Sequence, residues 1–336
     1  MKKKNNIVLK MVNIKKKRNL KLTVLVILGI FIINFELYPL VSSNSNYTLS
    51  LEKGSQIFEV VYYDEEAWKD IINVTSNPTD WFGGESDTIG AKSKITILGT
   101  SYGGSGTYAP FIKLFFSWFD VNTSILSKYG YNHSYFISYY PNDYNYWSPQ
   151  LKSWPFGTEP FDNYSNCRIH DSSSFLFYKP LDFQSVLYDY NDFAAVVNND
   201  TALQAINFSM PILSGDDFLW HFILDRYVMA NPINNYLTEV INALECENVS
   251  VHENKITFMR FGEKAYIMEF TYNSQGSLDT IIVKSNANNL IYKITSSNLK
   301  FVVYIIIGIC SGAILGLIGF SFYRKRRLTF LLKSNL

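Results

Sequence analysis

Apolar and polar residues alternate through the segment 249–295, in short runs separated by breaks that contain Gly, Asn or Glu. A period of two places successive side chains on opposite faces of a strand. Breaks this short join only antiparallel neighbours. The pattern therefore predicts an antiparallel β-meander, with strands at 249–252, 255–261, 265–272, 278–284 and 290–295.

The chain before the meander mixes helical and strand-like patterns. Asp64, followed by two glutamates, predicts the start of a short helix. Apolar residues at helical spacing in 215–244 predict a helical hairpin divided at Pro232. The Gly-Gly-Ser-Gly stretch at 103–106 predicts a hairpin tip, and residues 141–166, rich in Pro, Asn and Asp, predict a long loop. Other strand-like runs lie at 56–63, 94–98, 111–119, 135–140 and 174–178.

These elements together predict an α+β fold built on an antiparallel β-meander with a short helical hairpin. The motif Ile57-Phe-Glu-Val60 has a faint echo in Ile267-Met-Glu-Phe270. Such an echo is compatible with two related sheet-rich modules. We therefore expect a first module at 44–179 and a second at 180–298.

The uncharged, mostly apolar run from Phe301 to Tyr323 is followed at once by four basic residues, 324–327. A helix of this length spans about 34 Å, enough to cross a hydrocarbon core. Basic residues stay on the cytoplasmic side. The pattern predicts a C-terminal transmembrane helix at 301–323 and a cytoplasmic tail at 324–336. Small residues every four positions predict a pairing face for a homodimer, at Gly308, Gly312 and Gly316.

The first 21 residues carry nine Lys or Arg and no acid, and the apolar run 22–33 follows. This order is typical of a secretory signal. Residues 1–43 are thus expected to form a signal peptide or an uncleaved signal anchor. Both readings place residues 44–298 outside the cell. We expect them to form the ectodomain of a single-pass protein of the cell membrane.

Charge is distributed unevenly along the chain. The whole sequence has a formal net charge of +1, but residues 44–298 hold 15 basic and 28 acidic residues, a net charge of −13. A negative field of this size repels nucleic acid and anionic head groups and favours solubility or basic partners. We expect no nucleic-acid partner.

Two features of the predicted ectodomain fit export. Cys167 and Cys246 are its only cysteines and are available for one disulfide, although two cysteines do not define a framework. Asn-x-Ser/Thr sequons, possible glycosylation sites, occur only between the two apolar runs. They lie at Asn46, Asn73, Asn122, Asn132, Asn163, Asn199, Asn207 and Asn248.

Aromatic residues are concentrated between residues 129 and 161. Exposed aromatic faces near Asn and Asp suit a glycan or a protein partner, whereas the plainer interpretation places most of these rings in the core. The rings on the predicted loop, Tyr144, Tyr146, Trp147 and Trp154, are the candidate ligand contacts. The earlier part of the run contains Tyr129, Tyr131, Tyr135, Phe136, Tyr139 and Tyr140.

The search for chemistry gives no catalytic, cofactor or metal motif. The glycine stretch at 103–106 departs from a nucleophile elbow at Thr107, and the four histidines show no zinc spacing. Asp189 and Asp192 offer oxygen ligands without an EF-hand pattern. The sequence therefore favours an extracellular binding protein. An anchored glycosidase-like hydrolase and a curved sheet that binds lipid are the alternatives.

Two stretches, Asn77-Pro-Thr-Asp-Trp-Phe-Gly83 with Ile89-Gly-Ala-Lys-Ser-Lys94, and Tyr272-Asn-Ser-Gln-Gly-Ser-Leu278, resemble segments that recur in uncharacterised archaeal surface proteins of the Asgard type. The resemblance implies a secreted, sheet-rich, single-pass architecture. It implies no activity.

Overall fold

The computed structural model describes residues 47–49, 51, 53–107, 121–140, 143–157, 168–170, 175–224 and 228–298. In this part of the chain no helix is both long and apolar enough to cross a membrane. The predicted signal segment, the run 301–323 with its three glycines, and the tail 324–336 lie outside the described residues.

Ten strands of the described chain form one antiparallel sheet. Their bounds are β1 Gly54–Tyr63, β2 Lys92–Thr107, β3 Asp143–Gly157, β4 Arg168–His170, β5 Leu176–Phe177, β6 Val249–His252, β7 Lys255–Phe261, β8 Ala265–Tyr272, β9 Leu278–Ser285 and β10 Leu290–Asn298. The order is β4-β3-β2-β1-β10-β9-β8-β7-β6, and β5 pairs with β3. Two meanders are thus joined where β1 pairs with β10.

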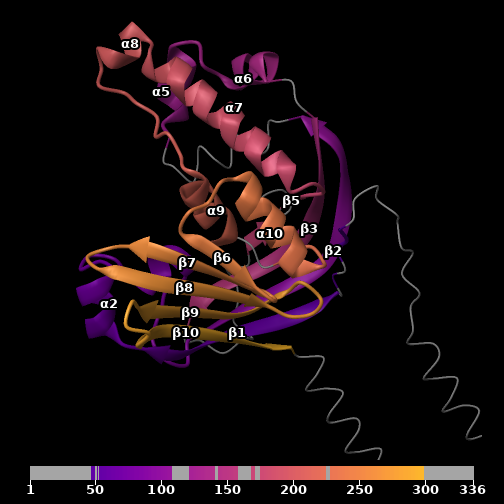
Figure 1. Cartoon of the computed structure of the whole chain (residues 1–336), viewed down its shortest axis with the longest axis vertical. Helices are drawn as coiled ribbons and strands as arrows, with labels where there is room; N and C mark the ends of the chain where they lie inside the picture. The colour runs from indigo at the N-terminus through magenta and orange to yellow at the C-terminus, as the bar shows by residue number, and fades with distance from the viewer. Residues whose placement is uncertain are drawn as a thin grey trace, which may run out of the picture. The chain divides into compact units, whose positions relative to one another are not determined.

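Helices connect and cover these strands. They are α2 Glu65–Ile71, α3 Pro78–Phe82, α5 Thr123–Lys128, α6 His133–Tyr139, α7 Leu181–Asn198, α8 Thr201–Gln204, α9 Gly215–Leu224 and α10 Ile233–Ala243. The sheet curves around α9 and α10, while α7 extends away from it toward α5, α6 and α8 (Figure 1). Helix α7 contacts both α9 and α10, and α10 contacts β6.

The two faces of the sheet differ in composition. Along β8 the burial alternates strictly, so Tyr266, Met268 and Phe270 are buried and their neighbours are not. Trp220 of α9 packs edge-to-face on Phe258 of β7, which identifies the buried side as the core face. We call the opposite side, turned away from α9 and α10, the outer face.

Part of the core face is filled by what we call the aromatic core cluster, in which the rings contact one another in series. Trp68 of α2 lies 4.8 Å from Trp81, and Phe82 stacks on Tyr292 of β10 at 5.8 Å. Trp68 is fully buried, and its Nε1 donates to the carbonyl of Ser76 at 2.9 Å. The members are Trp68, Trp81, Phe82, Trp220, Tyr266 and Tyr292.

The predicted meander is confirmed as β6–β10, because its strands carry both the alternation and the short turns that fix antiparallel pairing. The helix after Asp64 is also confirmed, since the Asp64 carboxylate accepts from the Ala67 amide at 3.0 Å. The helical hairpin appears as α9 and α10, and the second helix begins directly after Pro232. The antiparallel, sheet-rich α+β class is therefore correct for the described chain.

Three local predictions are wrong. Residues 135–140 were expected in a strand but belong largely to α6, where Tyr135 and Tyr139 stack one helical turn apart. The stretch 103–106 is not a hairpin tip but continues β2, with a register shift against β3. Much of the expected loop 141–166 is the strand β3, whose aromatic and apolar residues outweigh its prolines and asparagines.

The sheet also bears on the expected modules. Strands from both sides of residue 180 form one sheet, and β1 pairs with β10 along seven residue pairs.

The 18-residue helix α7 is absent from the prediction. Its buried residues are mixed with exposed apolar ones such as Leu181 and Tyr188, so the sequence shows no clean apolar stripe.

Candidate functional site

The four rings predicted as ligand contacts all lie on β3. Tyr144 and Trp147 are buried in the core, and Trp147 packs 4.4 Å from Tyr178. These two rings are therefore core residues, because the segment is a strand rather than a loop. Tyr146 is half-buried near Phe175. Trp154 is half-buried, 4.9 Å below the Lys94 ammonium.

A different aromatic group lies where α5, α6 and the C-terminal half of α7 meet. Asn122 caps α5 by accepting from the Ile125 amide, and the Asn132 side chain accepts from the Tyr135 amide as α6 begins. In α6, residues four apart lie on one face, so Tyr135 and Tyr139 stack with centroids 4.6 Å apart. We call the set Tyr131, Tyr135, Tyr139, Tyr140, Asp192 and Asp200 the tyrosine surface.

The tyrosine surface is partly anchored and partly exposed. Tyr131 packs edge-to-face on Phe193 of α7, and Tyr135 packs on the same ring. Tyr139 lies above Tyr135 and remains 63% exposed. A stacked pair with one exposed ring presents a flat aromatic face held in place from below.

Two carboxylates accept hydrogen bonds from these tyrosines. The Tyr131 hydroxyl donates to Asp200 at 2.8 Å, and the Tyr140 hydroxyl donates to Asp192 at 2.5 Å. The Tyr131 hydroxyl, aided by backbone amides, lowers the pKa of Asp200 below its usual range. Burial and then Asp200 raise the pKa of Tyr131 to about 12. Each of the two carboxyl groups has further acceptor positions beyond the tyrosine hydroxyl that it accepts from.

Asp189 of α7 is buried and accepts from the Tyr144 hydroxyl at 3.3 Å. Asn191, which lies between Asp189 and Asp192, forms a pair of hydrogen bonds with the Leu213 backbone. Within the described ranges, no group of three or more His, Cys, Asp or Glu is arranged to hold a metal ion. The polar side chains in this stretch of α7 therefore form hydrogen bonds with tyrosine hydroxyls and with a loop backbone.

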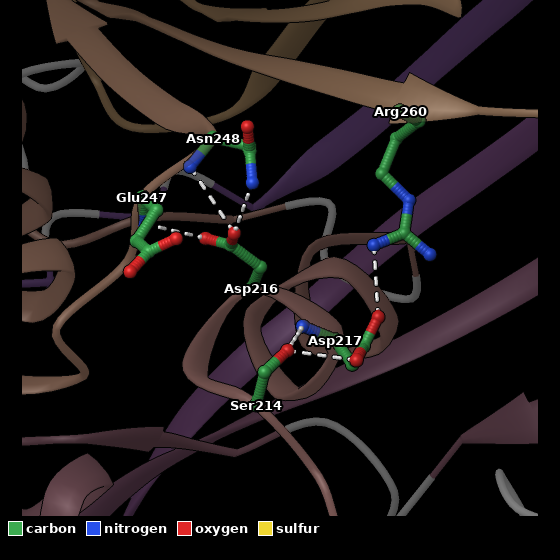
Figure 2. A network of polar contacts seen from close by, with 6 residues as sticks. All are labelled: Ser214, Asp216, Asp217, Glu247, Asn248 and Arg260. Atoms are coloured by element: carbon green, nitrogen blue, oxygen red, sulfur yellow. Dashed lines mark hydrogen bonds and ion pairs between the residues drawn. The ribbon is translucent and has the colours of Figure 1, made fainter.

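A separate polar network ties α9 to the meander (Figure 2). The Asp216 carboxylate accepts from the backbone amides of Glu247 and Asn248, both at 3.1 Å. Asp217 accepts from Arg260 of β7 at 2.9 Å, and Ser214 caps the helix through the Asp217 amide. This network fixes the start of α9 against β6 and β7.

Packing supports the same structural role for the network. The Arg260 guanidinium lies 5.0 Å from the Trp220 ring. Burial alone raises the pKa of Asp217, but Ser214 and Arg260 outweigh it, so the net shift is downward. Gly215 lets the backbone approach closely, because a Cβ there would lie 1.9 Å from the Leu244 carbonyl oxygen.

The predicted glycosylation sites can be compared with exposure. Six sequon asparagines lie in the described chain, and all six are exposed: Asn73, Asn122, Asn132, Asn199, Asn207 and Asn248. Four of them adjoin the helices that carry the tyrosine surface, at the starts of α5 and α6 and after α7 and α8. Asn46 and Asn163 lie outside the described residues.

The predicted disulfide has only one partner in the described chain. Cys246 is a half-buried free thiol within these ranges, and burial, followed by Asp216, raises its pKa. Cys167 is not described, so the pairing stays a prediction. A thiol with a raised pKa is a poor nucleophile at neutral pH.

No protein-family model, curated protein or solved structure matches this chain. Sequence reasoning included Tyr131, Tyr135, Tyr139 and Tyr140 in the aromatic run but preferred the rings of β3. It did not connect the run to Asp192 and Asp200, because hydrogen bonds spanning 52 and 69 residues leave no local sequence signal.

Proposed function

We propose that this chain is a membrane-anchored binding protein of the cell exterior, and that it binds a glycan at the tyrosine surface. The observation that carries the proposal is the stacked pair Tyr135–Tyr139, whose outer ring is 63% exposed. An exposed ring held by a packed partner offers a flat, preformed contact face to a ligand.

The chemistry of the surface suits a sugar. The apolar C–H face of a pyranose packs on an aromatic ring, while its hydroxyls donate to carboxylates. Asp192 and Asp200 supply carboxyl oxygens as acceptors beside the rings. Tyrosine loses little side-chain entropy on binding, because only two torsions are fixed.

The anchoring part of the proposal rests on the sequence. The run 301–323 and the basic residues after it support a single span with the ectodomain outside. The exposed sequons of the described chain are compatible with that placement.

The two alternative functions fit less well. A glycosidase needs two carboxyl groups that flank the scissile bond, whereas Asp189 and Asp192 lie three residues apart on one helix and both accept from tyrosines. A lipid carrier needs an apolar cavity, whereas α9, α10 and the aromatic core cluster occupy the core face of the sheet.

A glycan array tests the proposal with the full chain in detergent micelles. We expect saturable binding to at least one oligosaccharide class, lost in the double variant Tyr135→Ala/Tyr139→Ala. Tyr62→Ala is the matched control, because Tyr62 is an exposed tyrosine on β1. Absence of saturable binding, or equal binding by the double variant, would contradict the proposal. External protease on intact cells tests the anchoring separately, and protection of residues 44–298 would overturn it.

A further inference from the structure

The charges of the ectodomain are segregated, and the outer face of the sheet carries most of its strand-borne lysines. The pairing register places Lys92 opposite Glu59, Lys94 opposite Trp154, and Lys284 opposite Ile267. Among the strand residues whose side chains the structure describes, two acids occupy these alternating positions, Glu59 and Glu269. The lysines are Lys92, Lys94, Lys152, Lys255, Lys284 and Lys293.

The acids neutralise only part of this charge. Glu269 accepts from Lys255 and Lys284, both at 3.0 Å, and Glu59 lies 3.5 Å from Lys92. Burial raises the pKa of Glu269, but the two ammonium groups outweigh it and lower the pKa below its usual range. A third acid, Asp279, sits at a bulge of β9 and accepts from hydroxyl groups. The face therefore keeps a net positive charge at neutral pH.

Apart from these lysines and acids, the face carries uncharged residues. Its other positions include Thr96, Thr271, Thr280 and Thr295, whose side chains are half-buried, and the ring of Trp154 beneath Lys94. Threonine hydroxyls and an indole edge are groups that suit a polar interface with an apolar interior. The local charge is opposite to the net charge of −13 calculated for residues 44–298.

The position of the chain end indicates what lies near this face. Strand β10 ends at Asn298, and the apolar run begins at Phe301. Three residue steps span at most about 10 Å. Because β10 lies inside the sheet between β1 and β9, a span that begins at Phe301 would hold the C-terminal end of β10, and the sheet with it, close to the head groups. Basic groups within a Debye length of an anionic surface are attracted to it.

We propose that the outer face of the sheet docks on anionic head groups of the same bilayer that holds the anchor. The inference rests on the anchoring part of the proposed function, and it is independent of the glycan. It orients the sheet on the membrane. A protein whose net charge is repelled by such a bilayer would then be held there through one face.

The experiment uses the full chain in vesicles of phosphatidylcholine, with or without a fraction of phosphatidylglycerol. A water-soluble amine-acetylating reagent labels lysines, and mass spectrometry measures the rate at each site. Anionic lipid should slow labelling of Lys94, Lys152 and Lys293 by at least about fivefold. Labelling of the exposed Lys69 and Lys264 should not change. Salt at 1 M should remove the protection.

A matched pair of variants tests the cause. Lys94→Gln/Lys152→Gln should abolish the protection of Lys293, whereas Lys69→Gln/Lys264→Gln should preserve it. If the chain floats with both kinds of vesicle and its lysines are labelled equally in both, the docking of the outer face is overturned but the anchoring is not. Protection that depends on protein density rather than on anionic lipid would identify a second copy as the occupant and also overturn it. Failure to float with either vesicle would overturn the anchoring as well.

Discussion

The aromatic core cluster and the tyrosine surface use the same residue types in different surroundings. In the core cluster, Trp68 and Tyr292 are buried against the sheet and contact rings on several sides. At the tyrosine surface, Tyr135 and Tyr139 contact each other along one helix, and Tyr139 faces solvent. Burial, rather than aromatic content, separates rings that stabilise the fold from rings available to a ligand.

The comparison is tested most strongly by removing one ring from each region. Trp68→Ala should lower the free energy of unfolding by about 3–5 kcal/mol, because the fully buried indole leaves a cavity and an unpaired Ser76 carbonyl. Tyr139→Ala should change it by less than about 0.5 kcal/mol. Pulse proteolysis across a urea series measures both. Similar losses for the two variants would remove the distinction between the regions.

Single hydroxyl groups give a smaller contrast. The buried Tyr236 hydroxyl donates to the Phe177 carbonyl at 2.7 Å. Tyr236→Phe should therefore cost about 1–2 kcal/mol, because the carbonyl oxygen loses its donor away from water. Tyr139→Phe serves as the exposed control and should be close to neutral. The same urea series compares them, and a neutral Tyr236→Phe would show that this buried bond contributes nothing.

The pH dependence of the tyrosine surface gives the smallest effect. A lowered Asp pKa stabilises the folded state above the unfolded pKa of about 3.9, and this stability is lost as pH falls through the folded pKa. The Tyr131 hydroxyl is the first cause of the lowered Asp200 pKa. The stability difference between the wild type and Tyr131→Phe should thus be largest at neutral pH and shrink below about pH 3.9. A difference that grows in acid would contradict this assignment.

The sequence predicted regular alternation well and long-range contacts poorly. The meander β6–β10 was predictable because each strand and turn is encoded within a few residues. The extent of β3 was not, because Pro149 and Pro155 lie in a strand that is held by partners on both sides. Helix α6 was missed because Tyr and Phe favour strands when isolated, whereas in the structure Tyr135 of α6 packs on Phe193 of α7, a contact distant in sequence.

The candidate site shows the same limit. The aromatic run from Tyr129 to Trp147 was visible in the sequence, but the sequence did not show which rings face solvent. Tyr144 and Trp147 of β3 are buried in the core, whereas Tyr139 of α6 is exposed. Asp192 and Asp200 come close to Tyr140 and Tyr131 only after α7 folds beside α5 and α6.

The most direct test of the account is the dissociation constant of the full chain for an oligosaccharide that the array identifies. The account predicts that Tyr135→Ala/Tyr139→Ala raises this constant at least about tenfold, while Tyr62→Ala leaves it unchanged. Equal affinity of the double variant and the wild type would contradict the assignment of the tyrosine surface as the binding site.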